Sequence, residues 1–127
     1  GASYQSEFMN QYQLHGTYAP CASYRLLKKA ADTAEEMKLN YKVGSVVSGD
    51  VFYSELPELV WAKMGVLAGE MECAALYAVA ARAGKEALCM CTISDIIGGD
   101  AATNLTPEER QSSFDEMIRL ALEVADE

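Results

Sequence analysis

Two neighbouring segments of the sequence are apolar on nearly every side, and they limit most strongly what the chain can fold into. Residues 71–83 read as an Ala-rich helix that we expect to be buried on most sides. Gly84 follows it as a natural stop. Residues 87–93 form a continuous apolar run, which is typical of a strand covered on both faces. The chain must therefore bury a helix and a strand against further layers of structure.

The remaining segments alternate between helix and strand. Helices are expected over about residues 24–37 and 56–64 and from residue 106 onward, where Thr106, Pro107 and Glu109 supply an N-cap, a first-turn proline and a capping box. Residues 41–48 alternate like a strand. This order predicts an α/β fold with a mixed or largely parallel sheet and flanking helices. So few strands would leave open sheet edges, so we expect an incomplete half of a larger domain.

Composition narrows the class of protein. The 127 residues are 50% hydrophobic, which is enough for one core, and 19 acidic against 10 basic residues argue against a nucleic-acid groove. No apolar stretch approaches the roughly 20 residues of a membrane helix, and the start lacks the pattern of a secretion signal. The sequence thus predicts a cytoplasmic protein without nucleic-acid or membrane partners.

The four cysteines suggest neither a metal site nor disulfides. Cys89 and Cys91 lie two residues apart, too close along the backbone for an ordinary bridge, while Cys21 and Cys73 have no CxxC partner. His15 is the single histidine, so zinc is poorly supported. We expect buried, reduced cysteines and no metal.

Two acidic groups stand where an α/β fold would place a ligand. Glu70, Met71 and Glu72 open the Ala-rich helix, and Ser94 and Asp95 close the apolar strand. Ionised carboxylates accept hydrogen bonds from hydroxyls, so a cleft formed by both groups would suit a polyhydroxylated ligand. Taken alone, Glu70 and Glu72 could simply stabilise the positive end of a helix dipole.

Four motifs, in order, resemble the purine nucleoside phosphorylases of the bacterial hexameric (DeoD-type) family. They are Gly-Asp-Val-Phe-Tyr-Ser at 49–54, Gly-Glu-Met-Glu-Cys-Ala-Ala at 69–75, Cys-Thr-Ile-Ser-Asp at 91–95 and Glu-Arg-Gln-Ser-Ser-Phe at 109–114. Residues 1–3 also resemble the Gly-Ala of a central strand in that family. The resemblance covers essentially the whole chain but corresponds only to the C-terminal half of a typical member. It implies that residues 1–127 are half of a single nucleoside phosphorylase-like domain.

The resemblance implies an activity as well. Such enzymes are glycosyltransferases of purine salvage, which convert purine (deoxy)ribonucleosides and phosphate into free base and (deoxy)ribose 1-phosphate. They use no cofactor, since phosphate is a co-substrate, and they assemble as homo-oligomers (hexamers). The phosphate site draws on the N-terminal half, so that half, as a separate chain or a lost segment, is an expected partner.

Two matched residues would carry the chemistry, and a third, Ser94, would bind the substrate beside them. Asp95 would protonate or hydrogen-bond N7 of the leaving purine, for which its carboxyl must be neutral at the critical moment. Arg110 would pair with this acid, and because its charge favours the ionised carboxylate, we expect it to act after loop closure. Ser94 would orient the base or Asp95. Taken alone, Asp95 could be a cap and Arg110 a surface side chain.

Four more matched residues would bind the substrate. Glu72 would accept hydrogen bonds from the ribose hydroxyls, with Met71 packed under the sugar and Glu70 beside it. Phe52 would stack on the purine. Taken alone, Phe52 and Met71 would more simply be packing residues.

The chain departs from the family pattern after the Ser-Asp pair. Members commonly carry a His and an Arg shortly after this pair, whereas here Ile-Ile-Gly-Gly at 96–99 occupies that stretch, and the loop to Arg110 is about two residues longer. Substrate preference between 6-amino and 6-oxo purines therefore stays open. A nucleosidase of the methylthioadenosine or adenosylhomocysteine type is the nearest alternative, although the Arg110 motif favours the phosphorylase. The other alternative is an inactive fragment that binds nucleosides or only completes an assembly.

Overall fold

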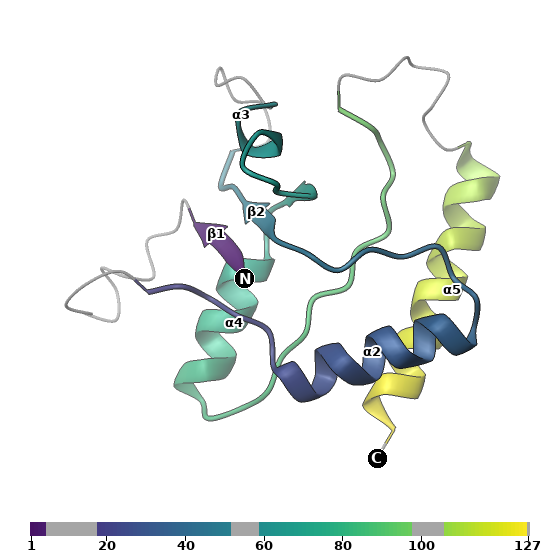
Figure 1. Ribbon diagram of the computed structural model, residues 1–127, viewed down its shortest axis with the longest axis horizontal. Helices are drawn as coiled ribbons and strands as arrows, with labels where there is room; N and C mark the ends of the chain where they lie inside the picture. Colours follow the sequence, from purple (N-terminus) through teal and green to yellow (C-terminus); the bar gives the residue numbers. More distant parts are fainter. Residues whose placement is uncertain (5–17, 52–58, 98–105, 127) are drawn as a thin grey trace. The chain divides into compact units, whose positions relative to one another are not determined.

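The computed structural model describes residues 1–4, 18–51, 59–97 and 106–126 (Figure 1). Its contacts divide the chain into two compact units. The first consists of Gly1–Ser23 and Gly44–Cys89, and the second of Tyr24–Val43 and Met90–Glu127. Both contain helices, and the first also contains a parallel sheet, so the predicted α/β class is confirmed. That residues 1–127 form half of a single domain remains a prediction.

Three short parallel strands form the sheet of the first unit. They are β1 (Ala2–Tyr4), β2 (Val46–Ser48) and β3 (Ala68–Glu70), in the order β1-β2-β3. Val46 lies opposite Ala2 on one side and Ala68 on the other. The predicted strand at 41–48 forms only over its last three residues, and β3 falls on an apolar run to which the sequence analysis assigned no structure. The short helix α3 (Leu59–Ala62) lies within the predicted helix 56–64, of which residues 56–58 lie outside the described ranges.

Helix α4 (Cys73–Arg82) packs against β1 and β2 and supplies the core of this unit. Cys73, Ala74 and Tyr77 are buried there, and four partly buried residues pack against them: Ala22, Val46, Ala87 and Cys89. The predicted stop at Gly84 is confirmed, since Gly84 has φ +63°. The amides of Gly84 and Lys85 donate to the carbonyls of Ala81 and Ala80, which is the Schellman pattern.

The expectation that this helix is buried on most sides is wrong for the described residues. Leu76 is 44% and Val79 51% exposed. Both lie on the side of α4 opposite the buried core residues. An apolar helix surface indicates a need for burial, but it does not say which neighbour supplies it.

The predicted strand at 87–93 is also wrong, because no ladder forms there among the described residues. Its backbone groups bond elsewhere in the first unit: Ala87 accepts from the Ser23 amide at 2.8 Å, and the Cys89 amide donates to the Tyr77 hydroxyl at 3.0 Å. The apolar run predicts burial, and residues 87–90 are indeed half-buried. A strand also needs a neighbour to pair with, which is a non-local condition.

Two of the four cysteines are linked, contrary to the expectation that all are reduced. Cys73 and Cys89 form a disulfide with Cα atoms 5.9 Å apart. Cys21 and Cys91 are not part of a disulfide and are exposed, so they are not buried as expected. Close spacing in the sequence did not indicate this pair. The Cys73–Cys89 pair is 16 residues apart, and the chain after α4 turns back to bring the two together.

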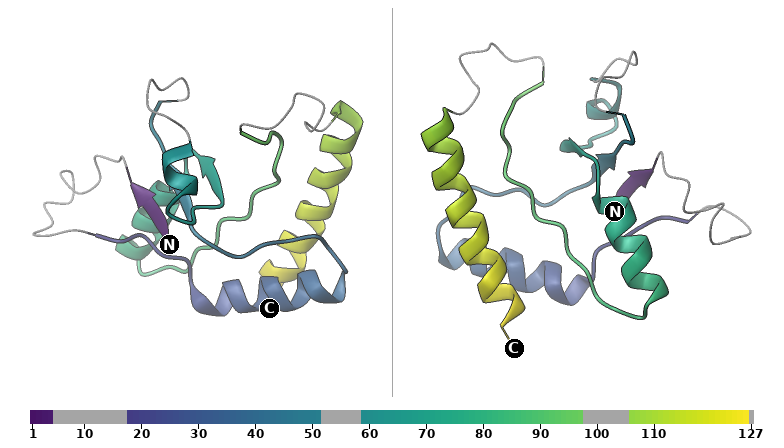
Figure 2. Two further views of the ribbon diagram at one scale, coloured as in Figure 1. Left: turned by 45° about the horizontal axis from the view of Figure 1, so that its top comes forward. Right: turned by 180° about the vertical axis from the view of Figure 1, so that it is seen from behind.

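Two helices make up most of the second unit. Helices α2 (Tyr24–Glu36) and α5 (Pro107–Ala125) cross in both views of Figure 2 and pack through Ala30 and Ala34 on α2 and Leu120 and Val124 on α5. The predicted capping box is confirmed: Thr106 accepts from the Glu109 amide at 3.2 Å and donates its own amide to the Glu109 carboxylate at 2.8 Å. In the described part of the chain, neither helix nor any other has the length and apolar character that a membrane crossing requires.

Candidate functional site

The turn between β3 and α4 carries the first group of predicted site residues. One carboxylate oxygen of Glu70 accepts the backbone amides of Glu72 and Cys73, both at 2.6 Å. The first amides of a helix have no partner within the helix, so this side chain satisfies two of them. Glu72, the residue at the N-cap position, makes no such bond with its own side chain. Glu70 is therefore the cap of α4.

Ser48, which no sequence motif singled out, completes this cap. Ser48, at the end of β2, is 5% exposed, and its hydroxyl accepts the amide of Ala74 at 2.8 Å. The same hydroxyl donates to the other carboxylate oxygen of Glu70. A small polar residue ending a strand of a parallel sheet is a signal that could have been found, because helix starts gather at that edge. Ser48 thus joins the ends of β2 and β3 to the first turn of α4.

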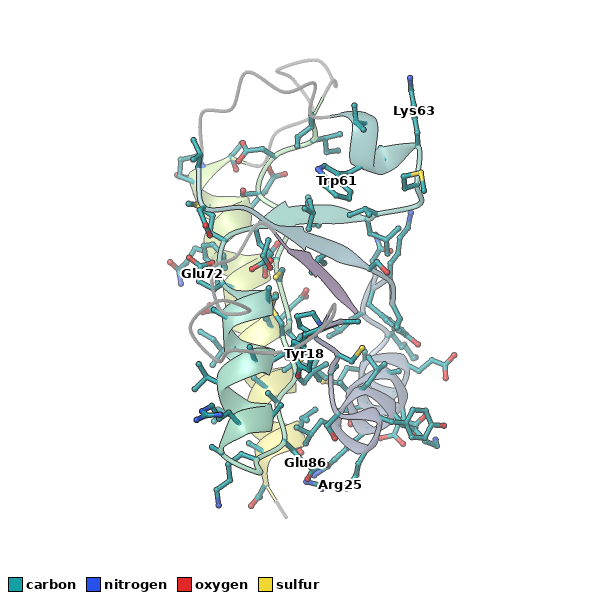
Figure 3. The ribbon with its side chains drawn as sticks, turned by 90° about the vertical axis from the view of Figure 1, so that its left-hand side faces the viewer. Tyr18, Arg25, Trp61, Lys63, Glu72 and Glu86 are labelled. Atoms are coloured by element: carbon teal, nitrogen blue, oxygen red, sulfur yellow. A yellow bond between two sulfur atoms is a disulfide. The ribbon has the colours of Figure 1, made fainter. Side chains whose placement is uncertain are left out.

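Met71 and Glu72 are presented outward by the turn that Glu70 and Ser48 hold. Met71 is 41% exposed, and Glu72 is exposed at the start of α4 (Figure 3). The carboxylate of Glu72 accepts the amide of Met71 at 3.2 Å. An ionised carboxylate offers about four acceptor positions, so Glu72 keeps capacity for hydroxyl donors. The two glutamates of the motif therefore differ in their surroundings.

Ser94 and Asp95 lie together in the second unit. The Ser94 hydroxyl donates to the Asp95 carboxylate at 2.7 Å, and Asp95 is exposed. Two residues earlier, the Thr92 hydroxyl contacts α5 at the Ser113 carbonyl (3.5 Å) and the Met117 sulfur (3.4 Å). These contacts attach the segment that carries Ser94 and Asp95 to α5.

Two predicted site residues remain without described side chains. Arg110 lies in the first turn of α5, the helix that Thr92 contacts, but its side chain is not among those described. Phe52 lies outside the described residues. The structure therefore brings Glu70, Met71 and Glu72 together in one unit, and Ser94 and Asp95 in the other. That both groups form one pocket stays a prediction.

The pKa of one ionisable group next to Arg110 is changed by its surroundings. The Thr106 amide, and then the Thr106 hydroxyl, hold the pKa of the Glu109 carboxyl below its ordinary value. Glu109 is thus kept ionised at the positive end of the α5 dipole. This charge stabilises the helix start that carries Arg110.

Comparison with known proteins defines the class. The model of the phosphorylase superfamily matches residues 2–127, so the chain belongs to that family. Among curated relatives, the chain is 48% identical over 120 residues to a DeoD-type purine nucleoside phosphorylase of Caldanaerobacter subterraneus subsp. tengcongensis, covering 92% of the chain and 51% of the relative. It is 46% identical over 127 residues to the DeoD-type enzyme of Clostridium perfringens strain SM101, covering 98% of the chain and 53% of that protein. The resemblance found in the sequence is confirmed, and the chain spans about half the length of the curated relatives it matches.

Proposed function

We propose that the chain is the nucleoside-binding part of a DeoD-type purine nucleoside phosphorylase. The enzyme would cleave purine (deoxy)ribonucleosides with phosphate, giving free base and (deoxy)ribose 1-phosphate. The observation that carries this proposal is the capped turn after β3, because it leaves the Glu72 carboxylate exposed while Glu70 holds the backbone. The names of the relatives support the same reaction.

Pentose recognition would fall to the turn after β3. Glu72 would accept the ribose hydroxyls, and a site built to pair with a hydroxyl strongly rejects an analogue that lacks it. Met71 would pack under the sugar, and Phe52 would stack on the purine. Stacking tolerates different bases, so these contacts would hold adenosine and inosine alike.

Release of the base would depend on Asp95. Breaking the bond between ribose and purine moves electron density into the base, and a proton on N7 stabilises the leaving group. The Ser94 hydroxyl already donates to the Asp95 carboxylate, so it would fix that side chain toward N7. Arg110 would move in on loop closure and stabilise the carboxylate that remains after proton transfer.

We expect the phosphate site in the half of the relatives that the chain does not cover. That half is the proposed partner, as a separate chain or as part of a longer one. Hexamer formation, a cytoplasmic location, purine salvage and the lack of a cofactor all stay predictions.

A reconstitution assay tests the proposal. The chain is combined with the part of the Caldanaerobacter relative that it does not cover, and base release from inosine and adenosine is followed with and without phosphate. That relative, split at the same point, is the positive control. We expect base release that requires phosphate. Release without phosphate would support a nucleosidase, and no release while the control is active would support an inactive fragment.

A further inference from the structure

We propose that Ser48 and Glu70 are positioning residues that fix Glu72 for recognition of the pentose hydroxyls. The inference rests on the proposed function, and it gives Glu70 a different role from the sugar contact expected of it. It also assigns a role to Ser48, which no motif of the sequence suggested. Both residues act through the backbone of the first turn of α4.

The surroundings of Ser48 show that its hydroxyl joins three elements. Ser48 is buried, at 5% exposed. Its hydroxyl accepts from Ala74 in α4 at 2.8 Å and donates to Glu70 at the end of β3, while Ser48 itself ends β2. A buried hydroxyl costs stability unless it is paired, and this one is paired as both donor and acceptor. It therefore has one favoured orientation.

The hydrogen bonds of Glu70 leave it little capacity for a ligand. Its carboxylate accepts two backbone amides at 2.6 Å and the Ser48 hydroxyl, so three of about four acceptor positions are in use. Contact with a sugar hydroxyl through the same lone pairs would release a helix amide. Glu72 accepts one amide, is exposed, and has its own amide held by Glu70. The backbone of Glu72 is thus fixed by Glu70, which Ser48 in turn orients.

Amide hydrogen exchange on the chain tests this geometry without any need for activity. Ser48→Ala should accelerate exchange of the Ala74 amide, and Glu70→Ala should accelerate the amides of Glu72 and Cys73, each by about tenfold or more relative to amides in the middle of α4. Glu70→Gln keeps an acceptor oxygen and should leave the Glu72 and Cys73 amides near the wild-type rate. Unchanged exchange in both alanine variants would overturn the proposal.

Substrate selectivity in the reconstituted enzyme tests the role. The quantity is the ratio of kcat/KM for inosine to kcat/KM for 2′,3′-dideoxyinosine, which measures how well the site uses the sugar hydroxyls. We expect Ser48→Ala and Glu70→Ala to lower this ratio about tenfold, because a small displacement of a binding group is costly. Glu70→Gln should restore most of it. If Glu70 instead contacted the sugar directly as a charged acceptor, Glu70→Gln would not restore the ratio.

Gly84→Ala is the matched control, because it strains the opposite end of the same helix. Gly84 has φ +63°, a conformation that a Cβ disfavours, while the site turn is untouched. If Ser48 only stabilised α4, Gly84→Ala and Ser48→Ala would lower both kcat/KM values alike and leave the ratio unchanged. An active wild type with an unchanged ratio in Ser48→Ala overturns this inference alone. An inactive wild type overturns the proposed function, and hydrogen exchange then still decides whether Ser48 and Glu70 fix the turn.

Discussion

Removing the hydroxyl of Tyr77 would separate the polar contribution of this side chain from its packing. Tyr77 is 6% exposed in the core of the first unit, and its hydroxyl accepts the amide of Cys89 at 3.0 Å. Tyr77→Phe keeps the ring and deletes that acceptor. The Cys89 amide is partly buried, so water replaces the lost bond only in part.

The expected cost follows from the burial of that amide. A typical intramolecular hydrogen bond contributes about 0.5–1.5 kcal/mol net, and a buried donor left without a partner costs about 1–3 kcal/mol. For a partly buried amide we expect a loss of about 1–2 kcal/mol in the free energy of unfolding. Tyr24→Phe makes the same chemical change at a residue that is 76% exposed, so it should stay within about 0.5 kcal/mol.

Urea unfolding provides the measurement. Trp61 is the single tryptophan and lies in the same unit as Tyr77, so its fluorescence reports unfolding of that unit. With a slope of about 1–3 kcal/mol per M of urea, Tyr77→Phe should lower the midpoint by roughly 0.3–2 M. Circular dichroism follows the Tyr24 control. A midpoint for Tyr77→Phe equal to that of the wild type would refute the reasoning that this hydroxyl satisfies the Cys89 amide.

Three further predictions concern the second unit. Leu120 is 9% exposed, so Leu120→Ala should lower the free energy of unfolding by about 2–5 kcal/mol, measured by urea unfolding followed by circular dichroism. Leu122 on the same helix is 65% exposed, so Leu122→Ala should lower it by about 0.5 kcal/mol or less. Equal losses would contradict the described packing of α5. The pKa of Glu109 is lowered in the folded state, so the stabilisation of α5 by this carboxylate should be present above the ordinary pKa of 4.5 and be lost as the pH falls through the lowered pKa. Glu109→Gln keeps the cap and should remove this pH dependence of the helix content. A Gln variant with the wild-type pH profile would contradict this prediction. Asp95→Ala should reduce kcat of the reconstituted enzyme about 10²–10⁴-fold, and retained turnover would exclude Asp95 as the acid.

Local signals in the sequence predicted the helix ends well. The capping box of Thr106 and Glu109 and the stop at Gly84 depend on residues only a few positions apart, and both are confirmed. The class of fold followed from the alternation of helices and strands. Such features are fixed by backbone chemistry within one turn, so a single sequence suffices to find them.

Non-local pairing was beyond the same reasoning. The apolar run at 87–93 indicated burial, which holds in part for residues 87–90 but not for Cys91 and Ile93, and no strand ladder forms there among the described residues. The Cys73–Cys89 disulfide joins residues that the turn after α4 brings together, and spacing alone did not predict it. Ser48 was missed for the same reason, because its partners Glu70 and Ala74 lie more than twenty residues further along the chain.

The candidate site was predictable to the extent that it is local. Glu70, Met71 and Glu72 share one turn as their order implies, but the division of labour between the two glutamates depends on hydrogen bonds that a motif does not contain. Ser94 and Asp95 are also neighbours in the sequence, and the hydrogen bond between them fits the orienting role expected of Ser94.

Phosphorus NMR of the reconstituted enzyme with inosine and inorganic phosphate tests the central claim most directly. If the chain supplies the pentose and base contacts of a phosphorylase, the phosphate signal should decline as a ribose 1-phosphate signal grows in step with free hypoxanthine. Hypoxanthine released while the phosphate signal stays constant would contradict that claim.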